Sequence, residues 1–423
     1  MKILYVSQYF PPEMGAPAAR AVELSRLWVQ QGHEVSVLTG FPNHPTGVVP
    51  PEYRKQLRRL VMRERLDGVD VTRTWLLPLP NRRSWERVSN YSSFFFSAAA
   101  TGTFLRRADV VIGTSPQLLV GLSAWWIARR QGVPFIFEVR DLWPESLAAV
   151  GAGGPQSLLH HTLARVAAFL YRNCDHIVVV TRAFKSYLSE HWAVPPNKMS
   201  VVENGVDTNL FSLQAADPRI CSELRADGRF VVSYIGTMGM AHGLETLLEA
   251  ARLLQFRSPQ VLFLLLGEGA EKQRLVNLTR SQGLTNVCFV DQQSRERIPA
   301  YICASDACLV MLKKADLFKT VLPTKLLEFM SCARPVILAV DGEARRIMDE
   351  AGAGIFVEPQ NSADLAAAIV RLAGDPELCN LLGSNGRRYV ADHFSRQQTA
   401  ERYIDVLESL CRPKAVESVA AAA

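Results

Sequence analysis

Residues 230–254 decide the fold class of this 423-residue chain, and they read FVVSYIGTMGMAHGLETLLEAARLL. A mostly apolar, β-branched run over 230–235 ends at a turn that contains three glycines. Apolar residues then recur at helical spacing, at Leu244, Leu247, Leu248, Ala251 and Leu254. A short apolar strand, a glycine turn and an amphipathic helix form the repeating unit of a parallel α/β sheet.

The same unit recurs along both halves of the chain. Short apolar runs lie at Ile3–Val6, Val35–Leu38, Val69–Thr72, Val110–Ile112, Phe135–Val139, Ile177–Val180, Phe230–Ile235, Val261–Leu266, Val287–Val290, Ala307–Val310, Val336–Ala339 and Ile355–Val357. Helical patterns separate them, as with the apolar residues Val22, Leu24, Leu27 and Trp28. Strands without polar alternation indicate parallel sheets covered on both faces. We therefore expect two Rossmann-like domains that face each other across a cleft, where ligands bind at the carboxyl ends of the strands.

The domain limits follow from turn and tail composition. Residues 203–207 read ENGVD, a turn signal with Asn-Gly at its centre. This places an N-terminal domain at 1–205 and a C-terminal domain at 206–395. A final helix with apolar residues on one side is expected over 396–412, and the tail 413–423, which ends in three alanines, is expected to be disordered.

Composition excludes several classes of protein. Hydrophobic residues make up 48% of the chain and charged residues 21%, enough for two sizeable cores. No run approaches the roughly 18–20 apolar residues of a spanning helix, and the first apolar run is too short for a signal peptide. The eight cysteines contain no CxxC pair, which indicates reduced structural thiols in the cytoplasm. The net charge of +6 comes without a nucleic-acid-binding motif, so no nucleic-acid partner is expected.

Basic residues gather around one aromatic run. The segment 54–65 carries six basic residues against one acid. Five arginines then bracket the run Tyr91–Phe96, at Arg82, Arg83, Arg87, Arg106 and Arg107. A basic, aromatic surface suits an anionic membrane. The alternative is a core helix with solvated flanks.

Glycine turns in the second half suit a phosphate and a nucleoside. The turn after Ile235 offers free N–H groups and an opening helix, and its candidate phosphate-binding residues are Gly236, Thr237, Gly239 and His242. His242 is equally consistent with an exposed helix start. The next turn contains Gly267, and the following strand ends at Val290. The turn with Gly267 either accommodates the nucleoside or is a flexible turn. The strand end at Val290 offers backbone contacts to the base.

The most informative segment is 318–330, FKTVLPTKLLEFM. Thr324 is a candidate N-cap, and Lys325 and Glu328 then lie on one face of a helix start. A carboxylate there can accept both hydroxyls of a ribose, and the adjacent lysine can neutralise a diphosphate. The alternative is an exposed ion pair, but a carboxylate among apolar neighbours indicates use.

Three loops of the first half are further candidates. The proline-rich turn 11–17 has Gly15 before a helix, which suits phosphate or a sugar hydroxyl, or is a tight turn only. Asp141 follows the strand 135–139 and could hold an acceptor hydroxyl or support the departing charge, while Glu138 is a candidate structural residue. His44 lies in a similar loop, and the pair at 160–161 is interpreted as non-functional. No Asp-x-Asp triplet or His/Cys cluster indicates a metal site, so glycine turns, helix dipoles and Lys325 are expected to stabilise the leaving group.

The ordered set of motifs resembles the family 4 glycosyltransferases of the GT-B fold over nearly the whole chain. It comprises the first loop with Gly15, Asn204-Gly205-Val206-Asp207 with Phe211, Gly236, Gly267-Glu268-Gly269, Glu328-Phe329-Met330 with Pro335-Val336, and Gly352-x-Gly354 with Pro359. The resemblance implies metal-independent transfer with retention, by attack on the face that the leaving phosphate departs from. It implies that Glu328 binds the nucleotide ribose, that Lys325 and the Gly236 turn face diphosphate or donor sugar, and that the last helix crosses back onto the first domain. A nucleotide-sugar donor is implied as substrate, with no separate cofactor.

Two positions depart from the family pattern. Thr320 stands where the family has its first glutamate, eight positions before Glu328, and the arginine and lysine usual after Gly236 are absent. Thr237, Lys319 or Lys325 are the candidates to replace them, and Thr320 itself is also a candidate donor-binding residue.

The version Phe-Lys-Thr-x-x-Pro-Thr-Lys resembles bacterial surface-polysaccharide enzymes, including the N-acetyl-L-fucosamine transferases of O-antigen assembly. This implies a UDP-activated amino sugar, a lipid-linked acceptor of the undecaprenyl-diphosphate type, and a place on the inner face of the cytoplasmic membrane. The rival functions are a UDP-sugar 2-epimerase on the same fold and a non-catalytic partner subunit that keeps the nucleotide cleft.

Overall fold

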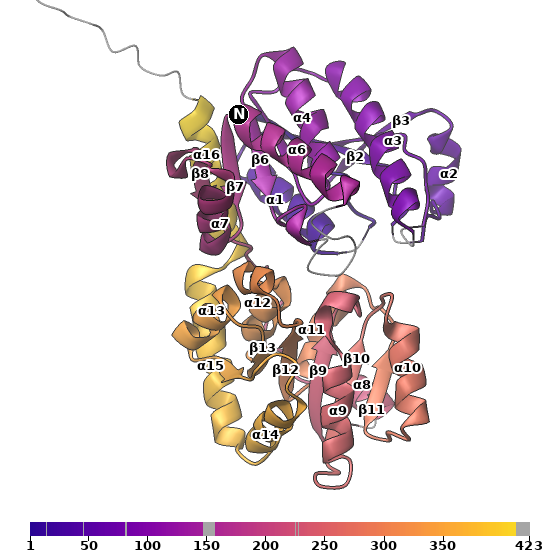
Figure 1. Cartoon of the computed structure of the whole chain (residues 1–423), viewed down its shortest axis with the longest axis vertical. Helices are drawn as coiled ribbons and strands as arrows, with labels where there is room; N and C mark the ends of the chain where they lie inside the picture. Colours follow the sequence, from indigo (N-terminus) through magenta and orange to yellow (C-terminus); the bar gives the residue numbers. More distant parts are fainter. Residues whose placement is uncertain are drawn as a thin grey trace, which may run out of the picture.

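The chain forms two α/β units, each built around its own sheet (Figure 1). The computed structural model describes residues 1–13, 15–44, 46–80, 83–146, 157–224, 226 and 228–411. The expected tail, 413–423, and the last residue of the expected final helix lie outside the described residues, as does Arg82.

The first sheet has eight strands in the order β3-β4-β2-β1-β5-β6-β7-β8. They are β1 (Lys2–Val6), β2 (Glu34–Gly40), β3 (Val61–Leu66), β4 (Val69–Thr74), β5 (Val110–Thr114), β6 (Phe135–Val139), β7 (His176–Val179) and β8 (Met199–Val201). Helices cover both faces: α1 (Ala16–Gln30), α2 (Pro51–Leu57), α3 (Ser84–Thr103), α4 (Leu118–Gln131), α6 (Leu158–Asn173), α7 (Arg182–Trp192) and the short η1 (Pro196–Lys198). Because both faces are buried, the central strands are apolar without alternation.

The second sheet has six parallel strands in the order β11-β10-β9-β12-β13-β14. They are β9 (Phe230–Ile235), β10 (Val261–Leu266), β11 (Val287–Val290), β12 (Ala307–Met311), β13 (Val336–Ala339) and β14 (Gly354–Phe356). The helices of this half are α8 (Pro218–Leu224), η2 (Met240–His242), α9 (Glu245–Leu254), α10 (Lys272–Ser281), η3 (Arg295–Arg297), α11 (Ile298–Cys303), η4 (Asp316–Thr320), α12 (Thr324–Ser331), α13 (Glu343–Ala351), α14 (Ser362–Ala373) and α15 (Pro376–His393). The last helix, α16 (Arg396–Cys411), lies on the first domain instead. Each of the twelve apolar runs identified in the sequence overlaps a strand.

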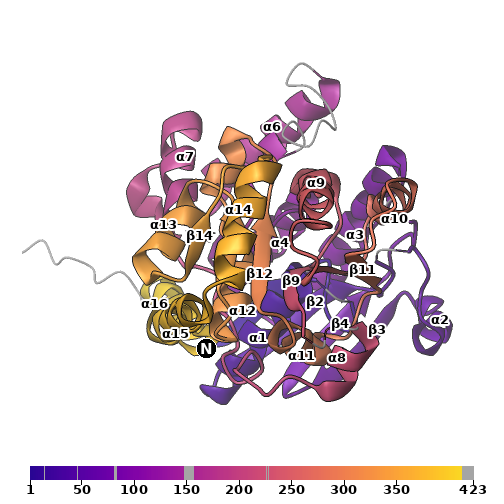
Figure 2. The same cartoon turned by 90° about the horizontal axis from the view of Figure 1, so that it is seen from below.

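Two strands have no counterpart in the sequence-based expectation. β8 has only three residues. β3 pairs with β4 as an antiparallel hairpin, so the first sheet is not parallel throughout. The basic segment 54–65, expected as one surface, is divided between α2 and β3, which lie at one edge of the molecule (Figure 2). β3 alternates between exposed and half-buried residues, because an edge strand buries one face only, and charged residues therefore hide its pattern.

The chain crosses between the domains twice, and the two crossings lie together. Val206 in the linker forms a β-bridge with Ser395, the residue before α16. From there α16 runs along the first domain (Figure 1), where the indole Nε1 of Trp28 donates to the carbonyl of Ala400 at 3.2 Å. The rings of Trp28 and Tyr403 meet edge to face with centroids 5.3 Å apart. The last helix therefore crosses back to the first domain, as the family resemblance implies.

Replacement of Gly205 by alanine is expected to loosen this double crossing. A Cβ at Gly205 would lie 2.5 Å from the hydroxyl of Thr399 and 3.0 Å from the backbone of Arg396. Overpacking of this kind costs about 1–3 kcal/mol, so Gly205→Ala should lower the midpoint of thermal unfolding by several degrees. The control is Gly374→Ala, where the nearest atom to a Cβ is 3.4 Å away. Equal midpoints for the two variants would show that the crossing is not tightly packed.

Candidate active site

The candidate nucleotide-binding residues of the second domain lie at the carboxyl ends of its strands, on the side that contacts the first domain. Two contacts define this side. The hydroxyl of Thr181, the N-cap of α7, donates to the carbonyl of Thr320 at 2.9 Å. Arg295 in η3 pairs with Glu23 of α1 at 2.7 Å. Parallel strands bring their carboxyl ends to one edge, which is where open α/β sheets bind ligands.

The turns after β9 and β10 pack directly on each other. Gly236 and Gly267 have φ values of 140° and 144°, which favour glycine. A Cβ on Gly267 would lie 2.1 Å from the carbonyl oxygen of Gly236. Any side chain at Gly267 would therefore push the two turns apart. The backbone of both turns forms one unit at the end of the sheet.

Lys325 points its ammonium group at this unit. It is the second residue of α12, and its Nζ lies 4.0 Å from the ring centroid of Tyr234 on β9. A Cβ on Gly236 would be 2.6 Å from the same Nζ. Within the described part of the chain, this buried nitrogen has no hydrogen-bond acceptor. Burial lowers the pKa of Lys325 to about 7, although the charge of Glu328 opposes the shift.

His242 and Thr237 complete the turn after β9. His242 belongs to the short helix η2, and its Nδ1 lies 3.2 Å from the carbonyl of Gly239. Burial, and then the charge of Lys325, lower the pKa of His242 to about 4, so its imidazole is neutral at neutral pH. Thr237 is exposed, and its carbonyl accepts from the hydroxyl of Tyr234 at 2.6 Å. The expected phosphate-binding residues are thus brought together.

Glu328 lies one turn further along α12 and pairs with a residue that the sequence analysis did not single out. Its Oε1 is 3.2 Å from Nη1 of Arg295, so Glu328 forms its ion pair with Arg295 and not with Lys325. Burial raises the pKa of Glu328, and the charge of Arg295 opposes that shift. The only sequence signal for Arg295 is its position in the turn after a strand end. The expected N-cap, Thr324, is instead the first residue inside α12, and Pro323 precedes it without a side-chain cap.

Two further candidate residues, Thr320 and Val290, form hydrogen bonds with other groups of the protein. The hydroxyl of Thr320 donates to the carbonyl of Leu317 at 2.7 Å, within its own turn η4. The carbonyl of Val290 accepts from the backbone N–H of Gly267 at 3.1 Å. Thr320 therefore marks a contact between the domains, and Val290 holds the β10 turn.

Asp141 and Glu138 both have internal partners. The carboxylate of Asp141 accepts from the indole of Trp143 at 3.1 Å and from the hydroxyl of Ser146 at 2.5 Å. Burial raises the pKa of Asp141. Each of its oxygens thus has one partner in the turn after β6, and a role toward the acceptor stays a prediction.

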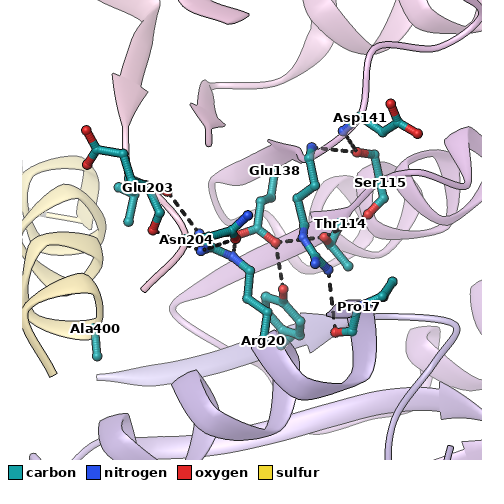
Figure 3. A network of polar contacts seen from close by, with 12 residues as sticks. Pro17, Arg20, Thr114, Ser115, Glu138, Asp141, Glu203, Asn204 and Ala400 are labelled. Carbon is teal, nitrogen blue, oxygen red and sulfur yellow. Dashed lines mark hydrogen bonds and ion pairs between the residues drawn. The ribbon is translucent and has the colours of Figure 1, made fainter. Parts of the chain in front are cut away.

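Glu138 is fully buried in the network of Figure 3. It accepts from Tyr5 at 2.6 Å, from Thr114 at 2.7 Å and from Arg20 at 3.0 Å. Arg20 in turn donates to Asn204 of the linker at 3.0 Å. This agrees with the interpretation of Glu138 as structural.

The first loop contains a buried carboxylate that sequence reasoning missed. Gly15, with φ 131°, precedes α1, as expected for a turn before a helix start. Next to it, Glu13 accepts from the backbone N–H groups of Asn43 and His44, both at 2.9 Å. Burial raises the pKa of Glu13 to about 7, against the opposing effect of these N–H groups. Glu13 thereby joins the loops after β1 and β2, where the ring of His44 packs 4.7 Å from that of Tyr9.

The aromatic run of α3 divides between core and surface. Phe94 is fully buried, whereas Phe96 is 70% exposed. An apolar groove of about 420 Å³ lies beside Phe96, lined by Phe95, Phe96, Ala99, Leu122, Trp125, Trp126 and Phe169. The guanidinium of Arg130 lies 5.9 Å from the ring centroid of Trp126. The run therefore supplies a core residue, as the core-helix interpretation expects, and also an exposed aromatic surface with Arg130 near it. Contact of this surface with a membrane stays a prediction.

The described residues show neither a metal-binding cluster nor a membrane-spanning helix. No group of three His, Cys, Asp or Glu side chains in that part of the chain could hold a metal ion. No helix there combines the length and apolarity needed to span a bilayer.

Comparison with protein families matches both halves of the chain. Residues 15–205 match a glycosyl transferase 4-like domain, and residues 220–389 match the glycosyl transferases group 1 domain. A probable glycosyltransferase of Pseudomonas aeruginosa, WbjE, is 25% identical over 74% of this chain and 77% of its own length. A putative colanic acid biosynthesis glycosyl transferase of Escherichia coli, WcaI, is 25% identical over 87% of this chain and 91% of its own.

Solved structures share the fold. Sucrose-phosphate synthase from Thermosynechococcus elongatus superimposes with a TM-score of 0.77 at 22% identity, over 97% of this chain and 98% of its own. The Anabaena protein HepE in complex with UDP-glucose gives a TM-score of 0.72 at 18% identity, over 97% of this chain and the whole of its own. These likenesses establish the two-domain architecture.

Proposed function

The chain is a glycosyltransferase of the GT-B fold, composed of a glycosyl transferase 4-like domain and a group 1 domain, and on that premise we propose that it transfers an N-acetylated amino sugar from UDP to a lipid-linked glycan. The observation that carries the donor half of this proposal is the buried ammonium of Lys325. A lysine Nζ held without an acceptor against a glycine turn suits an anionic ligand, because burial of an unpaired cation is costly. A nucleoside diphosphate supplies the missing charge.

The donor site has three parts in this proposal. The backbone N–H groups after Gly236 and the start of α12 receive the diphosphate, together with the charge of Lys325. Glu328 accepts the ribose hydroxyls. Neutral His242 offers a ring nitrogen to the phosphate or the sugar without adding repulsion. The Anabaena complex with UDP-glucose supports a UDP-sugar as the class of donor.

We propose metal-independent transfer with retention of configuration. In that reaction the acceptor hydroxyl attacks the anomeric carbon on the face from which the diphosphate leaves. The departing phosphate oxygen takes the proton of the acceptor, and Lys325 and the N–H groups of the glycine turn stabilise the charge that develops on it. No carboxylate nucleophile is required, which agrees with the internal engagement of Asp141.

The acceptor half rests on the first domain. The groove beside Phe96 and Trp126 is apolar, and two of the helices that line it, α4 and α6, carry the exposed arginines Arg129, Arg130 and Arg165. Apolar area beside basic side chains suits the anionic inner face of the cytoplasmic membrane, where an undecaprenyl-diphosphate-linked glycan would be presented. The relative WcaI, which is named for colanic acid biosynthesis, supports an acceptor from surface-polysaccharide assembly.

Titration with UDP, GDP and ADP in the presence of chelator tests the donor site. We expect UDP to bind most tightly. Glu328→Ala should cost about 1.5–3 kcal/mol, roughly a 10- to 150-fold rise in Kd, because charge-assisted hydrogen bonds to the ribose are lost. Glu249→Ala, an exposed glutamate on α9 of the same domain, is the control. A folded Glu328→Ala variant with unchanged affinity would contradict the ribose assignment.

The titration of Lys325 gives a second test. Its pKa of about 7 should rise when the diphosphate binds beside it, so the complex takes up a proton wherever the free lysine is neutral. Uptake should be close to about one proton per UDP near pH 8 and vanish near pH 6, and affinity should fall as pH rises above about 7. Calorimetry in two buffers of different protonation enthalpy measures this. Lys325→Met should bind weakly without uptake, and equal uptake in both proteins would exclude Lys325 from the diphosphate site.

Membrane contact is tested with the double variant Phe96→Ser/Trp126→Ser, because both side chains are exposed, Trp126 to 44%. We expect the wild type to sediment with anionic phosphatidylglycerol vesicles, and the double variant to stay largely unbound. Phe256→Ser is the matched control, since Phe256 is 86% exposed but belongs to the second domain. Undiminished sedimentation of the double variant would remove the groove from the membrane surface.

A further inference from the structure

Arg295 contacts carboxylates from both domains at once. It lies in η3, directly after the turn that follows β11. Its Nη2 is 2.7 Å and its Nε 3.1 Å from Oε1 of Glu23, on α1 of the first domain. Its Nη1 is 3.2 Å from Oε1 of Glu328, on α12 of the second. A planar guanidinium with five N–H donors suits such a bridge, which a lysine reproduces only in part.

The same carboxylate of Glu23 holds the helix that returns to the first domain. Its Oε2 lies 2.6 Å from Nε of Arg396, the first residue of α16. Two arginines and two glutamates thus form a cluster without net charge, with side-chain exposures between 5% and 29%. The guanidinium of Arg295 is also fixed in orientation, since it lies 5.0 Å from the ring centroid of Phe211. Partly buried, mutually paired charges of this kind depend strongly on one another.

We propose that Arg295 is a positioning residue that couples nucleotide binding at Glu328 to the contact between the two domains, through Glu23. The inference rests on the proposed function, in which Glu328 receives the ribose. A glutamate carboxylate has about four acceptor positions, so Glu328 can keep Arg295 and accept hydroxyls as well. Arg295 then orients the carboxylate and links it to α1. The affinity for the nucleotide accordingly depends on Glu23, a residue of the opposite domain.

The charged groups that face Glu328 determine how each substitution changes its protonation. They are Arg295 from η3, Glu23 from α1, Arg396 from the start of α16 and Lys325 from its own helix. Loss of Arg295 removes the largest influence that lowers the pKa of Glu328. It leaves burial and Glu23, which favour the protonated form, against the smaller effect of Arg396. Loss of the Glu23 charge leaves Arg295 without its partner on the first domain. Coupling free energies are reciprocal. If the contact of Glu23 with Arg295 strengthens nucleotide binding, bound nucleotide therefore stabilises the contact between the domains by the same free energy.

The test is a UDP titration of the whole chain in four forms: wild type, Glu23→Gln, Arg295→Met and Arg295→Lys. We expect Glu23→Gln and Arg295→Met each to weaken UDP binding about 5- to 20-fold, with partial recovery in Arg295→Lys. Arg346→Met is the matched control, because Arg346 also bridges two carboxylates, Glu343 and Glu350, but both belong to its own helix α13. The control should stay within about twofold of wild type.

Two further readouts separate positioning from a general loss of structure. In Arg295→Met, the fall in UDP affinity on acidification should begin at a higher pH than in wild type, since more Glu328 is protonated. Small-angle scattering should show that UDP compacts the wild type, and that Glu23→Gln loses this response. If Glu23→Gln does not fold, the pH profile of Arg295→Met still decides. An unshifted profile in that variant, with affinities equal to the control, would overturn the coupling.

The outcomes also distinguish this inference from the proposed function. A wild type that binds none of the three nucleotides contradicts the donor site itself. A wild type that binds UDP and loses affinity in Glu328→Ala, but not in Glu23→Gln or Arg295→Met, retains the donor site and excludes the coupling.

Discussion

The buried ion pair between Arg20 and Glu138 holds the first domain to the chain that leaves it. Both side chains are almost completely inaccessible, and the charged atoms are 3.0 Å apart. Burial alone would raise the pKa of Glu138, but the charges of Arg20 and Arg140 and the hydroxyl donors lower it, so the carboxylate is ionised. Removal of one partner from a buried pair costs about 3–5 kcal/mol, because the other charge is left unpaired.

This pair connects elements that are distant in sequence. Tyr5 on β1 and Thr114 on β5 donate to Glu138 on β6, and Arg20 on α1 reaches the carbonyl of Val202 and the side chain of Asn204 (Figure 3). The linker therefore leaves the sheet along a direction set by α1. One turn further along the same helix, Glu23 meets Arg295 and Arg396 of the second half. The helix α1 thus contacts both the linker and the second half of the chain.

Two buried cationic side chains, Arg20 and Lys325, differ in the hydrogen-bond acceptors around them. Arg20 is matched to a carboxylate and to three further acceptors on the linker, which is what a permanent structural charge requires. Lys325 has only the face of Tyr234 and the distant effect of Glu328, and its pKa falls to about 7. A charge left unsatisfied beside a backbone turn is typical of a binding site, where the ligand completes the interactions.

The sequence by itself determined the positions of the central strands and most of the residues proposed for the donor site. Apolar runs marked the central strands because parallel strands are buried on both faces, and Gly236, Gly267, Lys325 and Glu328 were found because turns and helix starts have local signals. Only the tertiary structure showed that Arg295 and Glu23 meet, since their attraction joins residues 272 positions apart and leaves no local pattern. It also assigned Asp141 to its own turn and Phe94 to the core, because burial depends on which neighbours arrive from elsewhere in the chain. The edge strand β3 was not predicted for a related reason. One of its faces is exposed to solvent, so the strand lacks the continuous apolar run that marks the central strands.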